Sequence, residues 1–385
     1  MATQREISPT EGQGHTLHSL AMHMAKQGFS LRTLLAGFKE WLLYRLATLG
    51  FDLFILMAMA LLLVVTVLAL GGHIRLLQAS VALPASATLA ALVARAWQKP
   101  GEWKMEVGHI LRDWVPFLFI VFIYENLHDV AGQAMDFDIA GTLYRWDVAL
   151  LGIEPTLWAQ RIFSPLLTDV LSISYALYFF QPLFIMFLLS LWDMRSELRH
   201  MALALTIAFV LGFMGYVFLP ASPPRYFIES LFTDPPRLYG LFLFDKLQGT
   251  WDSLSVISGG AFPSLHVGLS TVALIYAFRL RKVNRAFRIV WYVYLPLVVS
   301  LWFSTVYLRH HWVIDIFAGW IVAAAGLGGA ELLMRAWKRL RERYALPFSR
   351  GPLKSAQMLG ARKLATGAYT EVREDREFPG NNADG

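Results

Sequence analysis

The sequence has no cysteine and few charged residues. Among its 385 residues, Asp, Glu, Lys and Arg together make up 16% of the chain. The absence of cysteine excludes disulfide bonds, thiolate nucleophiles and cysteine-bound metal ions. A soluble protein of this length would have about a quarter of its residues charged. The low charge therefore argues against a soluble domain.

The sequence instead contains long apolar runs. Hydrophobic residues make up 56% of the chain, and several runs approach the ~20 residues that cross a bilayer. The sequence therefore predicts an all-α polytopic membrane protein with about eight transmembrane helices. The predicted spans are roughly 51–71, 76–95, 114–132, 167–192, 201–220, 262–279, 289–308 and 314–336.

The distribution of basic residues predicts the orientation of these spans. The formal net charge is +6, and Lys and Arg concentrate in the N-terminal segment, in the loops 96–113, 193–200 and 280–288, and after the last span. Eight spans place all of these on one side, and cytoplasmic loops carry such an excess, so both termini are expected in the cytoplasm. Basic residues of this kind face an anionic leaflet, and no nucleic-acid partner is expected.

The chain divides into four expected parts. Residues 1–50 are predicted to be a cytoplasmic tail that ends in an amphipathic helix lying in the membrane interface. An ordinary extension of the first span is the alternative for that helix. Residues 51–113 would hold two additional spans and a cytoplasmic loop, and 114–336 a six-span catalytic domain. Residues 337–385 are predicted to be a polar, largely disordered cytoplasmic tail.

Two polar clusters lie at the expected outer ends of the fifth and sixth spans. In the first, paired prolines predict a rigid, non-helical exit that presents Arg225, whose guanidinium suits a pair of phosphate oxygens. In the second, Pro263 is placed to begin a helix, where free N–H groups and the Ser264 hydroxyl would bind an anion. His266 follows inside an apolar span. An ionisable group at that depth favours a functional role over helix packing.

The third polar cluster contains Arg309, His310, His311 and Asp315. His311 and Asp315 are four residues apart, so on a helix they share one face. A carboxylate there accepts the proton of one imidazole nitrogen and leaves the other free as a nucleophile. A cluster that only anchors a helix end is the alternative. His310 would point ~100° away from His311, and its neighbour four residues on is Ile314, so it has no assigned role.

Together the three clusters predict phosphoryl transfer. Two histidines, two arginines and a helix start at one membrane level provide donors for phosphate oxygens, an attacking imidazole and an imidazole that protonates the leaving oxygen. A competing interpretation is a histidine-lined transporter that uses His266, His310, His311 and Asp315 as a metal or proton site. The chain has no evident internal repeat, which transporters often show.

Two motifs resemble those of the type 2 phosphatidic acid phosphatase superfamily. They are Pro-Ser-Leu-His at 263–266 and the pattern that joins Ser304, His311 and Asp315. Phe-Pro-Ser-Leu-His and His-His-Trp-x-x-Asp are most similar to the inositol phosphorylceramide synthase branch. The resemblance covers about 114–333. The superfamily pattern has lysine where this chain has Phe218 and arginine where it has Thr305.

The resemblance implies a metal-independent enzyme without a cofactor, built on a six-helix phosphatase-like core. His311 would form a phosphohistidine, Asp315 would orient it, and His266 would act as general acid and then as base. The implied phosphate-binding residues are Arg225, Ser264 and Arg309.

We therefore expect an integral membrane enzyme that acts on a phospholipid or other lipid phosphate at the extracytoplasmic or lumenal face. A lipid hydroxyl is the acceptor if the enzyme is a headgroup phosphotransferase. Water is the acceptor if it is a lipid phosphate or polyprenyl pyrophosphate phosphatase. The branch resemblance favours transfer, but the residues themselves do not decide between these acceptors.

Overall fold

The computed structural model describes residues 31–76, 80, 82–83, 87–88, 103–131, 137–192, 194–254, 259–344 and 346. Apart from loops and one isolated parallel bridge between Ala221 and Gly260, these residues are mainly helical, so the predicted all-helical fold is confirmed. The α-helices are α2 (Leu31–Leu49), α3 (Phe51–Ala69), α5 (Trp103–Ala131), α6 (Ala140–Leu151), α7 (Pro155–Ala159), α8 (Pro165–Ala176), α9 (Phe180–Leu191), α10 (Arg195–Phe218), α11 (Pro224–Phe227), α12 (Phe244–Leu254), α13 (Leu265–Leu280), α14 (Arg285–Tyr307) and α15 (Val313–Arg343). Two short 3-10 helices are η2 (Gln160–Ile162) and η3 (Glu229–Leu231).

The long apolar helices identify an integral membrane protein. Among the described residues, four helices, α3, α10, α14 and α15, are long and apolar enough to cross a membrane, and the pair α8 and α9, bent by 44°, makes a fifth candidate. Helices α5 and α13 lie at two further predicted spans. Most of 76–95, residues 1–30 of the N-terminal part and most of 337–385 lie outside the described residues. The count of eight spans and the six-helix core stay predictions. Helix α15 continues beyond the predicted span because the basic residues that follow are good helix formers.

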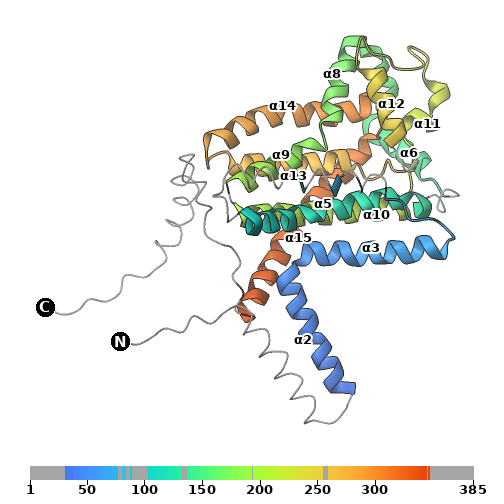
Figure 1. Ribbon diagram of the computed structural model, residues 1–385. Coiled ribbons are helices and arrows are strands. Elements are labelled where there is room, and N and C mark those ends of the chain that lie inside the picture. The colour runs from blue at the N-terminus through green and yellow to red at the C-terminus, as the bar shows by residue number, and fades with distance from the viewer. Residues whose placement is uncertain are drawn as a thin grey trace, which may run out of the picture. The chain divides into compact units, whose positions relative to one another are not determined.

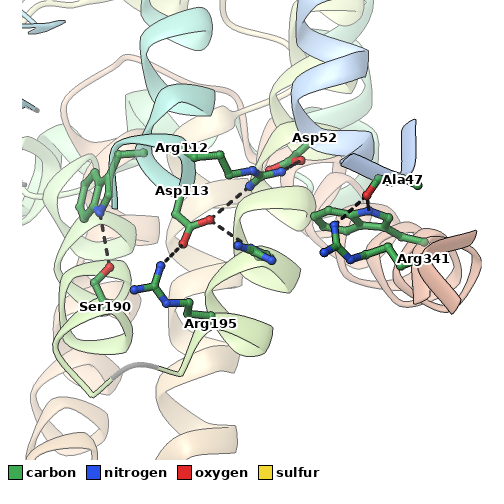
Figure 2. A network of polar contacts seen from close by, with 10 residues as sticks. Ala47, Asp52, Arg112, Asp113, Ser190, Arg195 and Arg341 are labelled. Carbon is green, nitrogen blue, oxygen red and sulfur yellow. Dashed lines mark hydrogen bonds and ion pairs between the residues drawn. The ribbon is translucent and has the colours of Figure 1, made fainter. Parts of the chain in front are cut away.

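The chain's contacts form two compact units, Met1–Phe51 with Arg335–Phe348 and Asp52–Met334 with Ser349–Gly385. In the first unit, the carbonyl oxygen of Ala47 on α2 accepts hydrogen bonds from the Trp337 indole at 3.1 Å and from the Arg341 guanidinium at 2.8 Å (Figure 2). A helix therefore forms where the sequence predicts one before the first span. Its position in the membrane interface and the four-part division of the chain stay predictions.

In the second unit, α10 and α13 form the centre of a bundle. Helix α10 packs against α5, α9 and α13, and α13 also packs against α9 and α14 (Figure 1). Consecutive residues of α10 from Met201 to Thr206 are buried, as expected of a helix with neighbours on several sides. The short helices α6, α11 and α12 gather at one end of this bundle (Figure 1).

Two glycines allow the start of α13 to lie close to its neighbours. A Cβ atom on Gly215 of α10 would lie 2.2 Å from Cδ of Pro263. One on Gly319 of α15 would lie 2.7 Å from the carbonyl oxygen of Ser264. Any larger residue would push these helices apart, because small residues set how closely membrane helices approach. The first turn of α13 is thereby fixed between α10 and α15.

A buried ion-pair network joins α3, α5 and α10. Asp113 contacts Arg199 at 3.0 Å, Arg195 at 3.3 Å and Arg112 at 3.4 Å (Figure 2). Arg112 also pairs with the fully buried Asp52 at 2.9 Å. Arg112 lies in the predicted loop 96–113 and Arg195 in the predicted loop 193–200. The charge distribution assigns both loops to the same membrane face. Their contact with the same carboxylate agrees with that assignment.

We expect Asp113→Ala to destabilise the protein by about 3–5 kcal/mol, because removing one partner of a buried charge network leaves the other charges under-compensated. The free energy of unfolding in detergent measures this. The control is Arg343→Ala, which breaks the exposed Arg343–Glu40 pair and should cost about 0–1 kcal/mol. Equal losses in the two variants would show that the Asp113 network does not stabilise the bundle.

Candidate active site

His311 lies in the turn between α14 and α15, and its orientation is fixed by two acceptors. Its Nδ1 is 2.8 Å from the carbonyl oxygen of Ala261 and 3.2 Å from Oδ2 of Asp315. Because both partners are acceptors, Nδ1 carries the proton and Nε2 keeps its lone pair. Asp315 is fully buried and also accepts the backbone N–H of Trp312 at 2.9 Å. The predicted His311–Asp315 pair is therefore present, in the tautomer that a nucleophile needs.

His266 lies on the first turn of α13 and faces this lone pair. Its Nδ1 is 3.2 Å from Nε2 of His311. Ser264 is the N-cap, with its hydroxyl accepting the Val267 N–H at 3.3 Å, and its own N–H donates to the Asp315 carbonyl at 3.2 Å. The helix thus begins at Leu265 and not at the proline that the sequence favours. This single cap ties both histidine-bearing segments together.

Arg225 lies at the start of the short helix α11, close enough to His310 for its charge to lower the pKa of that residue. The prolines end α10 and give an extended exit as expected, but the chain then re-enters a helix at Pro224. The Arg225 backbone N–H donates to the Arg309 carbonyl at 3.0 Å, and its NH1 pairs with Oδ1 of Asp252 at 3.1 Å. Its Nε is buried without a hydrogen-bond partner among the described residues. Arg225 therefore retains an unused donor for an anion.

The guanidinium of Arg309 is held in a different way. Arg309 has φ of 63°, which is uncommon for a residue with a Cβ atom, and its side chain is buried. NH1 and NH2 donate to the carbonyls of Pro236 and Pro235 at 2.8 Å each, and the guanidinium lies 3.7 Å from the Phe232 ring centroid. Burial lowers the Arg309 pKa to about 10. These contacts give Arg309 a structural role, and its predicted binding of phosphate stays a prediction.

The loop that orients His311 is itself pinned. The Ala221 N–H donates to the Gly259 carbonyl at 2.8 Å, and the Ala261 N–H donates to the Ala221 carbonyl at 3.1 Å. This short parallel bridge fixes the Ala261 carbonyl that contacts His311. On the other side, the fully buried Trp312 donates its indole N–H to the Ser222 carbonyl at 3.1 Å. Ala221 and Ser222, which precede the paired prolines, therefore support the segment that carries His311.

Asp147 of α6 is a positioning residue that the sequence analysis missed. It is fully buried, and its two carboxylate oxygens accept the N–H groups of Val313 at 2.7 Å and Ile314 at 2.9 Å. These N–H groups have no partner within α15, because they lie at its start, two residues after His311. No spacing in the sequence relates Asp147 to a helix 166 residues away. Burial raises the Asp147 pKa from 3.8 to about 6, and the nearby charge of Asp315 contributes to the shift.

We expect Asp147→Ala to lower kcat by about 10²-fold with little change in KM, because a small displacement of an attacking group removes much of its positioning. Steady-state rates of phosphoryl transfer by the purified protein measure both constants. Asp147→Asn keeps one acceptor oxygen and should recover most of kcat. An unchanged kcat in Asp147→Ala would contradict the positioning role.

The raised pKa of Asp147 also makes the stability of the protein depend on pH. The folded protein binds this proton more tightly than the unfolded chain, so the contribution of Asp147 is fully present below its unfolded value of 3.8. It is lost as the pH rises through about 6. Unfolding free energies measured from pH 4 to 7 should show this decline in the wild type, and Asp147→Asn should lack it.

Aromatic rings pack against His266. Tyr175 stacks on His266 with ring centroids 4.3 Å apart, and Tyr178 lies 4.0 Å from the same ring. Both tyrosines therefore pack against the residue that the family resemblance implies as general acid. Trp251 of α12, which the sequence did not single out, packs on Tyr175 at 4.8 Å.

Comparison with known families agrees with this arrangement. Residues 141–328 match the model of the PAP2 superfamily. That match confirms the family resemblance and includes His266, His311 and Asp315, together with Asp147. At the two positions where this chain departs from the superfamily pattern, Phe218 is exposed at the end of α10, and the Thr305 carbonyl accepts the backbone N–H groups of both His310 and His311 at 3.0 Å.

Similar curated proteins carry related names. A phosphoinositol dihydroceramide synthase of Bacteroides thetaiotaomicron is 30% identical over 184 residues, which cover 42% of this chain and 57% of that protein. An inositol phosphorylceramide synthase of Candida albicans is 32% identical over 155 residues, 37% of this chain and 31% of the relative. The catalytic subunit from Saccharomyces cerevisiae is 35% identical over 117 residues, 27% of either chain. The matched region thus spans between about a quarter and just over half of these relatives. No solved structure matches the chain significantly.

Proposed function

We propose that this protein transfers an inositol phosphate headgroup from a phospholipid to the hydroxyl of a ceramide-type lipid. The names of its relatives support both the headgroup and the acceptor, and the membrane helices support lipid substrates. The observation that carries the proposal is the His311 tautomer. With Nδ1 held by the Ala261 carbonyl and Asp315, Nε2 offers a lone pair beside a second imidazole.

In the first step, Nε2 of His311 attacks phosphorus, and the bond from phosphorus to the glycerol oxygen breaks. His266, as imidazolium, gives a proton to the departing oxygen. Phosphorus must lie between Nε2 and the leaving group, so the 3.2 Å contact between the two histidines has to open as the substrate enters. Asp315 stabilises the positive charge that His311 gains, and Arg225 binds a nonbridging oxygen.

In the second step, neutral His266 takes the proton of the acceptor hydroxyl, whose oxygen attacks phosphorus. The nitrogen–phosphorus bond breaks, and His311 returns to its starting tautomer. Water would use the same intermediate, so a transferase must keep water away from it. The Tyr175 ring stacked on His266 and the tilted Tyr178 ring beside it support such exclusion.

The site is proposed to lie at the extracytoplasmic or lumenal face, with both termini in the cytoplasm. Helix α10 carries Arg195 at its start, and its end leads to Arg225. Its 24 residues rise about 36 Å, enough to cross the hydrocarbon core. The positive-inside rule assigns the Arg195 end to the cytoplasm, and the histidines therefore belong to the opposite face.

Product analysis in water enriched in oxygen-18 tests the transfer reaction. Purified protein is given an inositol phospholipid and a ceramide, with and without a chelator. We expect a new inositol-containing ceramide product, activity that persists in chelator, and no release of inositol phosphate labelled with oxygen-18. Release of labelled inositol phosphate in place of a lipid product would identify a hydrolase that uses water as the acceptor, and loss of activity in chelator would contradict a metal-independent reaction.

A further inference from the structure

His310, next to the proposed nucleophile, is buried without a use for one of its nitrogens. Its residue is 7% exposed, and Nε2 has no hydrogen-bond partner among the described residues. The ring stacks on Tyr175 with centroids 4.6 Å apart and an interplanar angle of 20°, and its neighbour Trp251 meets it edge-on at 5.6 Å. A buried nitrogen left unpaired costs free energy, and such groups in native structures call for an explanation. Packing alone would be served equally well by a phenylalanine.

The surroundings of His310 belong to the same site as the two histidines of the reaction. The Tyr175 ring stacks on His310 and also on His266. Burial, and then the charges of Arg225, His311 and His266, lower the His310 pKa. The ring is therefore neutral near pH 7, with one donor and one acceptor nitrogen.

A neutral imidazole matches a hydroxyl group better than a phosphate oxygen. A hydroxyl both donates and accepts, whereas a phosphate oxygen only accepts. The neighbouring groups extend this preference: the unpartnered Nε of Arg225 is a donor, and the Asp252 carboxylate, with its side chain 48% exposed, is an acceptor. Donor, acceptor and an aromatic ring from Trp251 together suit a compact polyhydroxyl ring.

We propose that His310, with Arg225, Trp251 and Asp252, binds the hydroxyl groups of the transferred headgroup and sets the preference for a polyol. The inference rests on the proposed function and extends it, since it assigns the headgroup end of the donor to the side of the site formed by α12. His310 is thus a specificity-determining residue, distinct from the nucleophile that follows it.

Binding of soluble headgroups tests this without requiring turnover. The probes are inositol 1-phosphate and methyl phosphate, titrated into the purified full chain. We expect the wild type to prefer inositol 1-phosphate, and His310→Phe, which keeps a ring on Tyr175, to reduce the ratio of the two affinities about tenfold. His310→Gln, which keeps a donor and an acceptor, should restore part of the ratio.

Two results would overturn the proposal. Unchanged affinities for both probes in His310→Phe would make His310 a packing residue. An equal fall in both affinities, which leaves their ratio unchanged, would assign it to the phosphate and not to the polyol. The wild-type transfer assay is run alongside, so that absence of a ceramide product counts against the proposed function, whereas the two affinities decide the role of His310.

Discussion

His311→Ala is expected to lower the transfer rate by about 10⁴-fold or more, to the background of the assay. No other group among the described residues combines an oriented proton on one imidazole nitrogen with a free lone pair at the site. Loss of a nucleophile removes the covalent route entirely, and residual catalysis comes only from binding and charge stabilisation. The rate of headgroup transfer by the purified protein in detergent measures the effect.

The matched control is His200→Ala. His200 is a partly buried histidine that, like a histidine of the site, has a tyrosine and a carboxylate as neighbours, namely Tyr276 and Glu331, but it lies near the start of α10. That variant should keep its transfer rate within a few-fold of the wild type. A comparable collapse in His200→Ala would mean that loss of folding explains the His311 result.

His266→Gln is expected to lower the rate by about 10²–10⁴-fold, the usual contribution of a general acid and base. The size of the loss should depend on the leaving group. A donor that releases 4-nitrophenol needs no proton at the departing oxygen, so the first step should survive while the second remains slow. A burst of nitrophenol in proportion to the enzyme, followed by slow turnover, is the expected result.

In the wild type the rates of the two steps should differ less, because His266 assists both of them. If His266→Gln slowed the first step by the same factor with the nitrophenol donor and with the lipid donor, His266 would not act as the acid. In that case its 3.2 Å contact with His311 would serve only to orient the nucleophile.

Sequence patterns predict most of the core of this site. A spacing of four residues predicts the His311–Asp315 pair, and the turn before His266 predicts a helix start capped at the right place to within two residues. Both are local features, set by helix periodicity and capping chemistry. The structure further joins the two segments through the hydrogen bond from Ser264 to Asp315, which agrees with their expected convergence.

The partners contributed by distant segments could not be predicted in the same way. Asp147 meets the start of α15 only because α6 folds back over that end of the bundle, and no local pattern encodes such a contact. Arg309 shows the converse. Its position beside His311 favours phosphate binding, yet the turn at positive φ aims its guanidinium at the carbonyls of Pro235 and Pro236. A side chain's direction in such a turn depends on backbone dihedrals that residue type alone does not fix.

Mapping the covalent intermediate tests the central claim most directly. The His266→Gln protein is mixed with the nitrophenyl donor carrying a labelled inositol phosphate, quenched in alkali to preserve the nitrogen–phosphorus bond, and digested for mass spectrometry. We predict that the label is on His311, in proportion to the enzyme, and that it disappears when ceramide is added and allowed to react. Label on another residue, or a burst of nitrophenol with no labelled peptide containing His311, would contradict the account.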